Sequence, residues 1–156
     1  MKPAIGITPA HLASNVSLLS TLLSDEMALY IKTRKFHWNV SGESFMELHK
    51  LFQDQYTELE ETIDEIAERI GKLGSKTIGT MKEFSDLTRL KESPNVYPSQ
   101  KEMLAELLGD HETIIVELRK DIDESEKTKD AGTTDFLTGI MQLHETIAWV
   151  LRRYLN

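Results

Sequence analysis

Two histidines, His37 and His49, lie twelve residues apart on either side of Ser41-Gly42, a pair that favours a break between helices. Two carboxylates, Asp64 and Glu68, follow farther along the chain and are separated by about one helical turn. Imidazole nitrogens and carboxylate oxygens are ligands for zinc, iron and other divalent transition metals. These four side chains therefore predict a metal site, and the question is how the chain brings them together.

The spacing excludes an ion shared by His49 and Asp64 of one chain. They are 15 residues apart in an expected unbroken helix, which is about 22 Å at the α-helical rise. A metal–ligand bond is only about 2.0–2.2 Å long. Either the two groups have unrelated roles, or the site closes between two copies of the chain.

A polar stripe favours the second alternative. Residues spaced by three and four along the second helix share one face, and here that face is too polar for a bundle core. Under twofold symmetry, one end of this helix meets the other end of its partner, so histidines of one copy would meet carboxylates of the other. The stripe consists of His49, Gln53, Tyr56, Glu60 and Asp64.

The remaining candidate ligands have ordinary explanations. Asp64 and Glu68 could be solvated surface charges, and Glu68 could pair with Arg69 or Lys72. We expect His111 and His144 to be hydrogen-bonded core histidines, and His11 to lie at the surface. Di-iron bundles bind metal internally through Glu-x-x-His motifs. No such motif is present in this sequence. The residues three positions before His37, His49, His111 and His144 are Arg34, Met46, Leu108 and Met141, and none of them is acidic.

Four long helices must position these groups. Apolar residues recur at steps of three and four over residues 9–39, 43–71, 99–129 and 136–155. Thr8-Pro9 is typical of a helix start, and Asp130 to Thr134 should form a turn. In the long connection 75–98, Thr80 and Glu83 form a capping box. It predicts a short helix with Met81, Phe84 and Leu87 facing inward.

Short loops join antiparallel helix pairs, whereas a long connection can cross the length of a bundle. The order short loop, long connection, short loop predicts an all-α, ferritin-like four-helix bundle, with a short helix in the crossover between helices two and three. At 156 residues we expect a single domain, 1–156, with a short N-terminal arm over residues 1–8.

Composition narrows the classes of function. The absence of cysteine excludes disulfides and thiolate metal sites. The net charge is −8, and Lys2 is the only cation before Lys32, so a basic arm for nucleic acid is missing. No apolar run exceeds five residues, and the start lacks a signal-peptide pattern. We therefore expect no membrane span and a cytoplasmic location.

At the level of motifs, the chain resembles the Dps-type mini-ferritins. The run His37-Trp38-Asn39-Val40-x-Gly42-x-x-Phe45-x-x-x-His49, followed by Asp64-x-x-Ala67-Glu68-Arg69, is similar to the signature of that family. The similarity extends over the whole chain, including the helix lengths and the end without a fifth long helix.

The resemblance implies a hollow homododecamer that oxidises Fe²⁺, preferably with hydrogen peroxide, and stores ferric oxyhydroxide against oxidative stress. His37 and His49 would be ligands from one subunit, and Asp64 and Glu68 from its neighbour, at a ferroxidase centre. Trp38 matches the family tryptophan beside that centre, which passes electrons or absorbs radicals; a plain packing aromatic is the alternative.

The chain departs from the family at Gln53, where Asp or Glu is usual; a neutral amide is a weaker ligand for a hard cation. The second iron position is therefore in question. The family also takes up iron through acidic threefold pores, for which Asp130 is the best candidate, with Asp121 and Glu126 beside it. Two other functions remain open: a DNA-binding protective protein, and a cage that holds zinc without redox activity.

Overall fold

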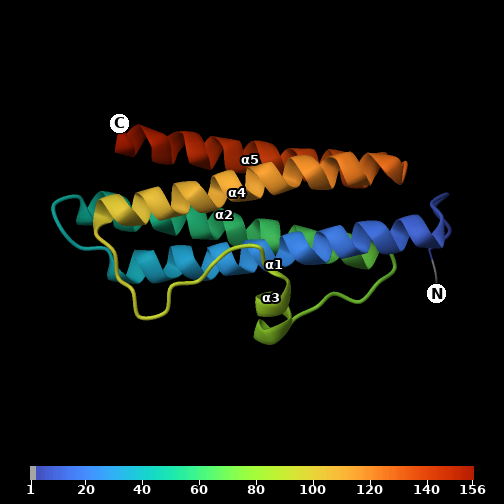
Figure 1. Cartoon of the computed structure of the whole chain (residues 1–156), viewed down its shortest axis with the longest axis horizontal. Coiled ribbons are helices and arrows are strands. Elements are labelled where there is room, and N and C mark those ends of the chain that lie inside the picture. The colour runs from blue at the N-terminus through green and yellow to red at the C-terminus, as the bar shows by residue number, and fades with distance from the viewer. Residues whose placement is uncertain (1–2) are drawn as a thin grey trace.

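The computed structural model describes residues 3–156 and contains four long helices and a short one: α1 (Pro9–Asn39), α2 (Phe45–Lys72), α3 (Met81–Leu87), α4 (Gln100–Lys127) and α5 (Ala131–Leu155). The long helices lie side by side as a bundle, and α3 lies outside it, beside α1 (Figure 1). The predicted all-α, ferritin-like architecture with a short helix in the crossover is confirmed.

The first hairpin, α1 and α2, carries the histidine pair. Thr8 caps α1, since the backbone N–H of His11 donates to its Oγ1 at 3.3 Å. The chain leaves α1 after Asn39 and reverses direction through Gly42, whose φ of 116° lies in a region that glycine adopts far more easily than other residues. This reversal brings the end of α1 against the start of α2.

The crossover helix α3 begins at the predicted capping box, with the side chains of Thr80 and Glu83 bonding reciprocally to backbone N–H groups. The prediction of three inward residues was wrong. Met81 is 63% exposed and Leu87 41% exposed, and only Phe84 packs against the core cluster. A seven-residue helix outside the bundle has too little length to bury a full apolar face.

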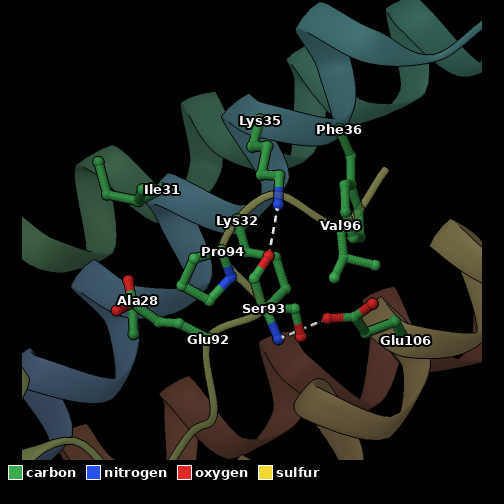
Figure 2. A pocket seen from close by; sticks show the side chains of 10 residues that line it. All are labelled: Ala28, Ile31, Lys32, Lys35, Phe36, Glu92, Ser93, Pro94, Val96 and Glu106. Carbon is green, nitrogen blue, oxygen red and sulfur yellow. Dashed lines mark hydrogen bonds and ion pairs between the residues drawn. The ribbon is translucent and has the colours of Figure 1, made fainter. Parts of the chain in front are cut away.

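Buried charge holds the crossover to the bundle. Arg89 donates from Nε to Asp25 at 2.7 Å and from Nη1 to Asp121 at 3.0 Å. Farther along, Lys35 donates to the Ser93 carbonyl at 2.8 Å, as Figure 2 shows in the hollow beside α1. These contacts fix the connection against α1 and α4.

The second hairpin differs from its prediction. Asp130 to Thr134 were expected to form a turn, but α5 already begins at Ala131. Asp130 is the N-cap residue, and its Oδ1 accepts from the backbone N–H of Thr133 at 3.1 Å. The capping carboxylate stabilises the first turn, so the helix tolerates Gly132 within it.

Apolar side chains of all four long helices form one core. Leu19, Leu29, Phe52, Leu107 and Leu137 are fully buried. In the part of the chain that the structure describes, no helix has the length and hydropathy needed to cross a membrane.

Candidate metal centre

His37 and His49 face each other where α1 meets α2. Their rings stack with centroids 3.7 Å apart and planes inclined by 23°. Each ring also bonds to the other residue's backbone. Nδ1 of His37 lies 2.8 Å from the carbonyl oxygen of His49, and Nδ1 of His49 lies 2.9 Å from the carbonyl oxygen of His37. The sequence prediction that the two imidazoles share one region is confirmed.

These reciprocal bonds select the ring tautomer. A carbonyl oxygen only accepts hydrogen bonds, so each Nδ1 must carry the proton and donate. In the neutral ring, Nε2 is then left with a lone pair. Metal-ligating histidines are commonly oriented in this way, by a carbonyl that accepts from the other ring nitrogen. The two rings are therefore pre-oriented to offer Nε2 to a cation.

Aromatic side chains and an arginine lie beside the histidine pair. Tyr56 packs edge-on against His37 with centroids 5.2 Å apart. The Arg34 guanidinium lies over Tyr56 at 4.5 Å and over Trp38 at 5.3 Å, and it donates to the Tyr30 hydroxyl at 2.7 Å. Trp38 itself is 63% exposed, so within one chain it is not a packed core aromatic.

The carboxylate candidates lie elsewhere on α2. Asp64 and Glu68 are both exposed, and Glu68 accepts from Lys72 at 3.2 Å, rather than from Arg69. Because α2 runs unbroken from Phe45 to Lys72, the predicted separation of His49 from Asp64 holds. Among residues 3–156, one chain brings together no group of three His, Asp or Glu side chains that could hold a metal ion.

Gln53 lies one turn beyond His49 and is exposed. The neighbouring Asp54 is paired with Lys50. Together with Glu60 and Asp64, Gln53 lies on an exposed polar stripe along α2, as the sequence predicts. Large apolar side chains flank one end of this stripe, since Phe45 is 39% exposed and Met46 is 74% exposed. An exposed polar stripe with an apolar margin is suited to contact with another subunit.

The three residues suggested for an iron-uptake pore have different surroundings. Asp130 is buried and bonds to Arg69, Asn15 and Thr133. Burial by itself would raise the pKa of Asp130. The hydrogen bonds from Thr133, the positive charge of Arg69 and the bond from Asn15 outweigh it, and hold the pKa below its ordinary value.

Asp121 is also buried and bonds to Arg89. Its burial raises its pKa, and the neighbouring Arg89 only partly compensates. Of the three, only Glu126 is exposed, and it lies in an open hollow at the α4–α5 turn together with Asp130, Asp135 and Thr138.

Two of the three remaining histidines lie in the core, as the sequence predicts. His111 and His144 are fully buried, and their Nδ1 atoms are 2.8 Å apart. His11, which was expected at the surface, is half-buried. Sequence reasoning missed the partner of the two buried histidines, Glu26, which is also fully buried. Its position was informative, because Leu19, Leu22, Leu23, Glu26 and Leu29 follow the spacing of one helical face.

Comparisons with known proteins agree with this fold. A family model for the ferritin-like domain matches residues 16–156. The chain is 44% identical to an uncharacterized low temperature-induced protein of Nostoc sp., over 97% of this chain and 86% of that protein. It is 37% identical to DNA protection during starvation protein 2 of Bacillus anthracis, over 90% of this chain and 96% of that one.

Solved structures show the same architecture. DpsC from Streptomyces coelicolor superposes with a TM-score of 0.96 at 27% identity, covering 100% of this chain and 91% of that chain. The Dps protein of Vibrio cholerae, described as a member of a superfamily of ferritin-like diiron-carboxylate proteins, gives a TM-score of 0.93 at 26% identity and covers 99% and 97%.

Proposed function

The chain belongs to the Dps family within the ferritin-like superfamily, and we propose on this basis that it oxidises Fe²⁺ and stores the product in a cage. The observation that carries the proposal is the histidine pair. Its Nδ1 atoms are held by backbone carbonyls 2.8 and 2.9 Å away, which leaves Nε2 for a cation. The cage would be a homododecamer in the cytoplasm.

In the proposed site, His37 and His49 of one subunit meet Asp64 and Glu68 of a second copy. One iron would be held by His37 with the two carboxylates, whose negative charges neutralise that of Fe²⁺. The second iron would depend on His49, a bridging oxygen and the residue at position 53. Two Fe²⁺ ions supply the two electrons that reduce one H₂O₂ to two hydroxide ions. Trp38, which is exposed and follows His37 in the sequence, would donate an electron if only one iron is bound.

Two features support completion of the site by another copy. The histidines lie where α1 meets the start of α2, and the carboxylates lie farther along α2, so one chain cannot bring them together. The surface between them is exposed, with a polar centre and an apolar margin at Phe45 and Met46. Both are expected of a chain that buries this face against a symmetry-related subunit.

The test of this function is an oxidation assay on the assembled protein. After anaerobic loading with Fe²⁺, hydrogen peroxide should oxidise the iron faster than oxygen does, followed by absorbance in the ultraviolet. The active species should run as a dodecamer of the 17.8 kDa chain in analytical ultracentrifugation. A cage that binds Zn²⁺ or Fe²⁺ without oxidising iron would favour the zinc-binding alternative, and an active monomer would contradict the shared site.

The residue at position 53 should control the second metal position. A neutral amide cannot offset the charge of a second cation as a carboxylate would, so we expect one tightly and one weakly bound metal per site. A crystal soaked in limiting Fe²⁺ or Zn²⁺ should show one strong anomalous peak beside the histidines. Gln53→Glu should strengthen the second peak and speed the first phase of iron oxidation.

Asp54→Asn is the matched control for Gln53→Glu, because Asp54 is adjacent in sequence but pairs with Lys50. It should leave both metal positions unchanged. Two equally occupied ions in the unmodified protein would show that Gln53 does not limit the second position.

We expect no strong binding to DNA. The net charge is −8, and cations of α1 are engaged within the chain. Lys32 pairs with Asp110 at 2.6 Å, and Lys35 donates to the Ser93 carbonyl. Neutralisation of phosphates has no obvious source. Gel retardation at low and moderate salt, with and without Mg²⁺, measures this. Plasmid retained in the well at ordinary salt without divalent metal would reveal an unrecognised basic surface.

For iron uptake we propose the hollow at the α4–α5 turn, with Glu126 and Asp135 at its exposed surface. Asp130 also lines this hollow, but it is buried and bound to Arg69. Its contribution to uptake would therefore be through the shape of the turn and its negative charge.

A further inference from the structure

Three fully buried ionisable side chains form a hydrogen-bonded chain through the bundle core, outside the candidate metal centre. Glu26 comes from α1, His144 from α5 and His111 from α4, and none has measurable exposure. Nε2 of His144 is 2.6 Å from Oε1 of Glu26, and its Nδ1 is 2.8 Å from Nδ1 of His111. These hydrogen-bonded side chains thus link three of the four long helices.

Among residues 3–156, no other charged side chain contacts these three residues. On α2 the buried side chains include no ionisable group, and the polar ones among them are Gln55 and Thr62. Charged residues adjacent in sequence to these three are paired elsewhere: Asp25 with Arg89, Asp110 with Lys32, and Glu145 with Arg119. The protons on Glu26, His144 and His111 therefore decide the charge of this part of the core.

The geometry restricts the number of protons. Each of the two contacts requires one shared proton, because two lone pairs or two N–H groups would repel. With only these two protons, the three side chains together have a net charge of −1. A third proton on Nε2 of His111 makes them neutral. An uncompensated charge in a dry core is costly. Burial and then the neighbouring His144 also lower the pKa of His111, so its ring is neutral in either case.

The surroundings of His111 favour the third proton. Nε2 of His111 and Oε1 of Gln55 are both buried, and neither has a hydrogen-bond partner among the described residues. Tyr30 contacts Tyr56 and Lys32 contacts Asp110, which places Gln55 and His111 near the same level of the bundle. A protonated Nε2 of His111 would be a donor at the level where Oε1 of Gln55 is an acceptor without a partner. An unprotonated Nε2 would instead add a second acceptor at that level.

We propose that Glu26, His144 and His111 form a proton-binding site that carries three protons and no net charge at neutral pH. The site stores one proton more than two neutral imidazoles and an ionised carboxylate would hold. Its consequence is a bundle whose stability depends on pH in both directions.

The direction in which stability changes with pH follows from the unfolded state, where histidine has a pKa of about 6.5 and glutamate a pKa of about 4.3. Above about pH 6.5 the unfolded groups hold fewer than three protons, so stability falls as pH rises. Below about pH 6.5 they hold more than three, so stability falls as pH drops. Near pH 8 the difference approaches one proton, which is about a tenfold loss in the folding equilibrium constant per pH unit.

Glu26→Gln tests the proposal, because the amide keeps the shape and hydrogen bonds without the charge. Both rings are then neutral, and the stored proton is lost. Denaturant midpoints of wild-type and Glu26→Gln cages, at one protein concentration from pH 7 to 8.5, give the comparison. Relative to the variant, the wild-type folding constant should fall by a factor approaching ten per pH unit. Parallel curves would overturn the proposal.

Glu145→Gln is the matched control, since Glu145 adjoins His144 but pairs with Arg119; it should keep the wild-type slope. A second measurement needs no variant. In wild-type cages with ¹⁵N-labelled histidine, solid-state NMR near pH 7.5 should show His111 protonated at Nε2 and accepting at Nδ1. The opposite tautomer, protonated at Nδ1, beside an ionised Glu26 carboxylate would identify the two-proton state and overturn the proposal.

Discussion

Cages assembled from a mixture of His49→Ala and Asp64→Ala chains should recover iron oxidation that neither variant has alone. Removal of a supporting residue around a metal typically costs 10–100-fold, so loss of a ligand should slow oxidation by about 100-fold or more. In a mixed dimer, the Asp64→Ala chain supplies intact histidines and the His49→Ala chain supplies intact carboxylates. One of its two sites is therefore complete.

The recovery has a defined size. With random pairing, half of the dimers are mixed and half of their sites are complete, so about a quarter of wild-type activity should return. The control mixes wild-type chains with chains carrying both substitutions, which should also give about a quarter. A site built within one subunit predicts zero for the first mixture and about half for the second. Activity is measured by peroxide oxidation of Fe²⁺ after subunit exchange is verified by mass spectrometry.

Asp130→Ala should destabilise the protein by about 3–5 kcal/mol, because it leaves a partly buried guanidinium without its partner. Arg69 is bound to Asp130 at 3.1 Å, and Asn15 and Thr133 bond to the same carboxylate. The substitution also removes the N-cap of α5. Thermal or denaturant unfolding of the assembled protein measures the loss.

Asp135→Ala is the control, because Asp135 lines the same hollow but is exposed; its effect on stability should stay within about 0.5 kcal/mol. The pKa of Asp130 is below its ordinary value, so the stabilisation is present above about pH 4 and is lost as pH falls through the folded pKa. Asp130→Ala with unchanged stability and slower iron uptake would instead assign this carboxylate directly to the pore.

The sequence by itself determined the helices and the candidate ligands, because both depend on local spacing. Apolar steps of three and four, the capping box at Thr80, and the lengths of the connections are sufficient for a four-helix bundle with one crossover. The distance from His49 to Asp64 follows from helix geometry alone, and with it the conclusion that one chain cannot close the site.

Only the tertiary structure decided which polar groups meet across the bundle. The bonds from each histidine ring to the other's carbonyl depend on how α1 and α2 pack, and they fix the tautomers. The sequence did not predict that the carboxylate of Asp130 bonds to Arg69, 61 positions away. Glu26 reaches His144 across 118 positions. Helical periodicity places a residue on a face, whereas partners so distant in sequence are set by the register between packed helices.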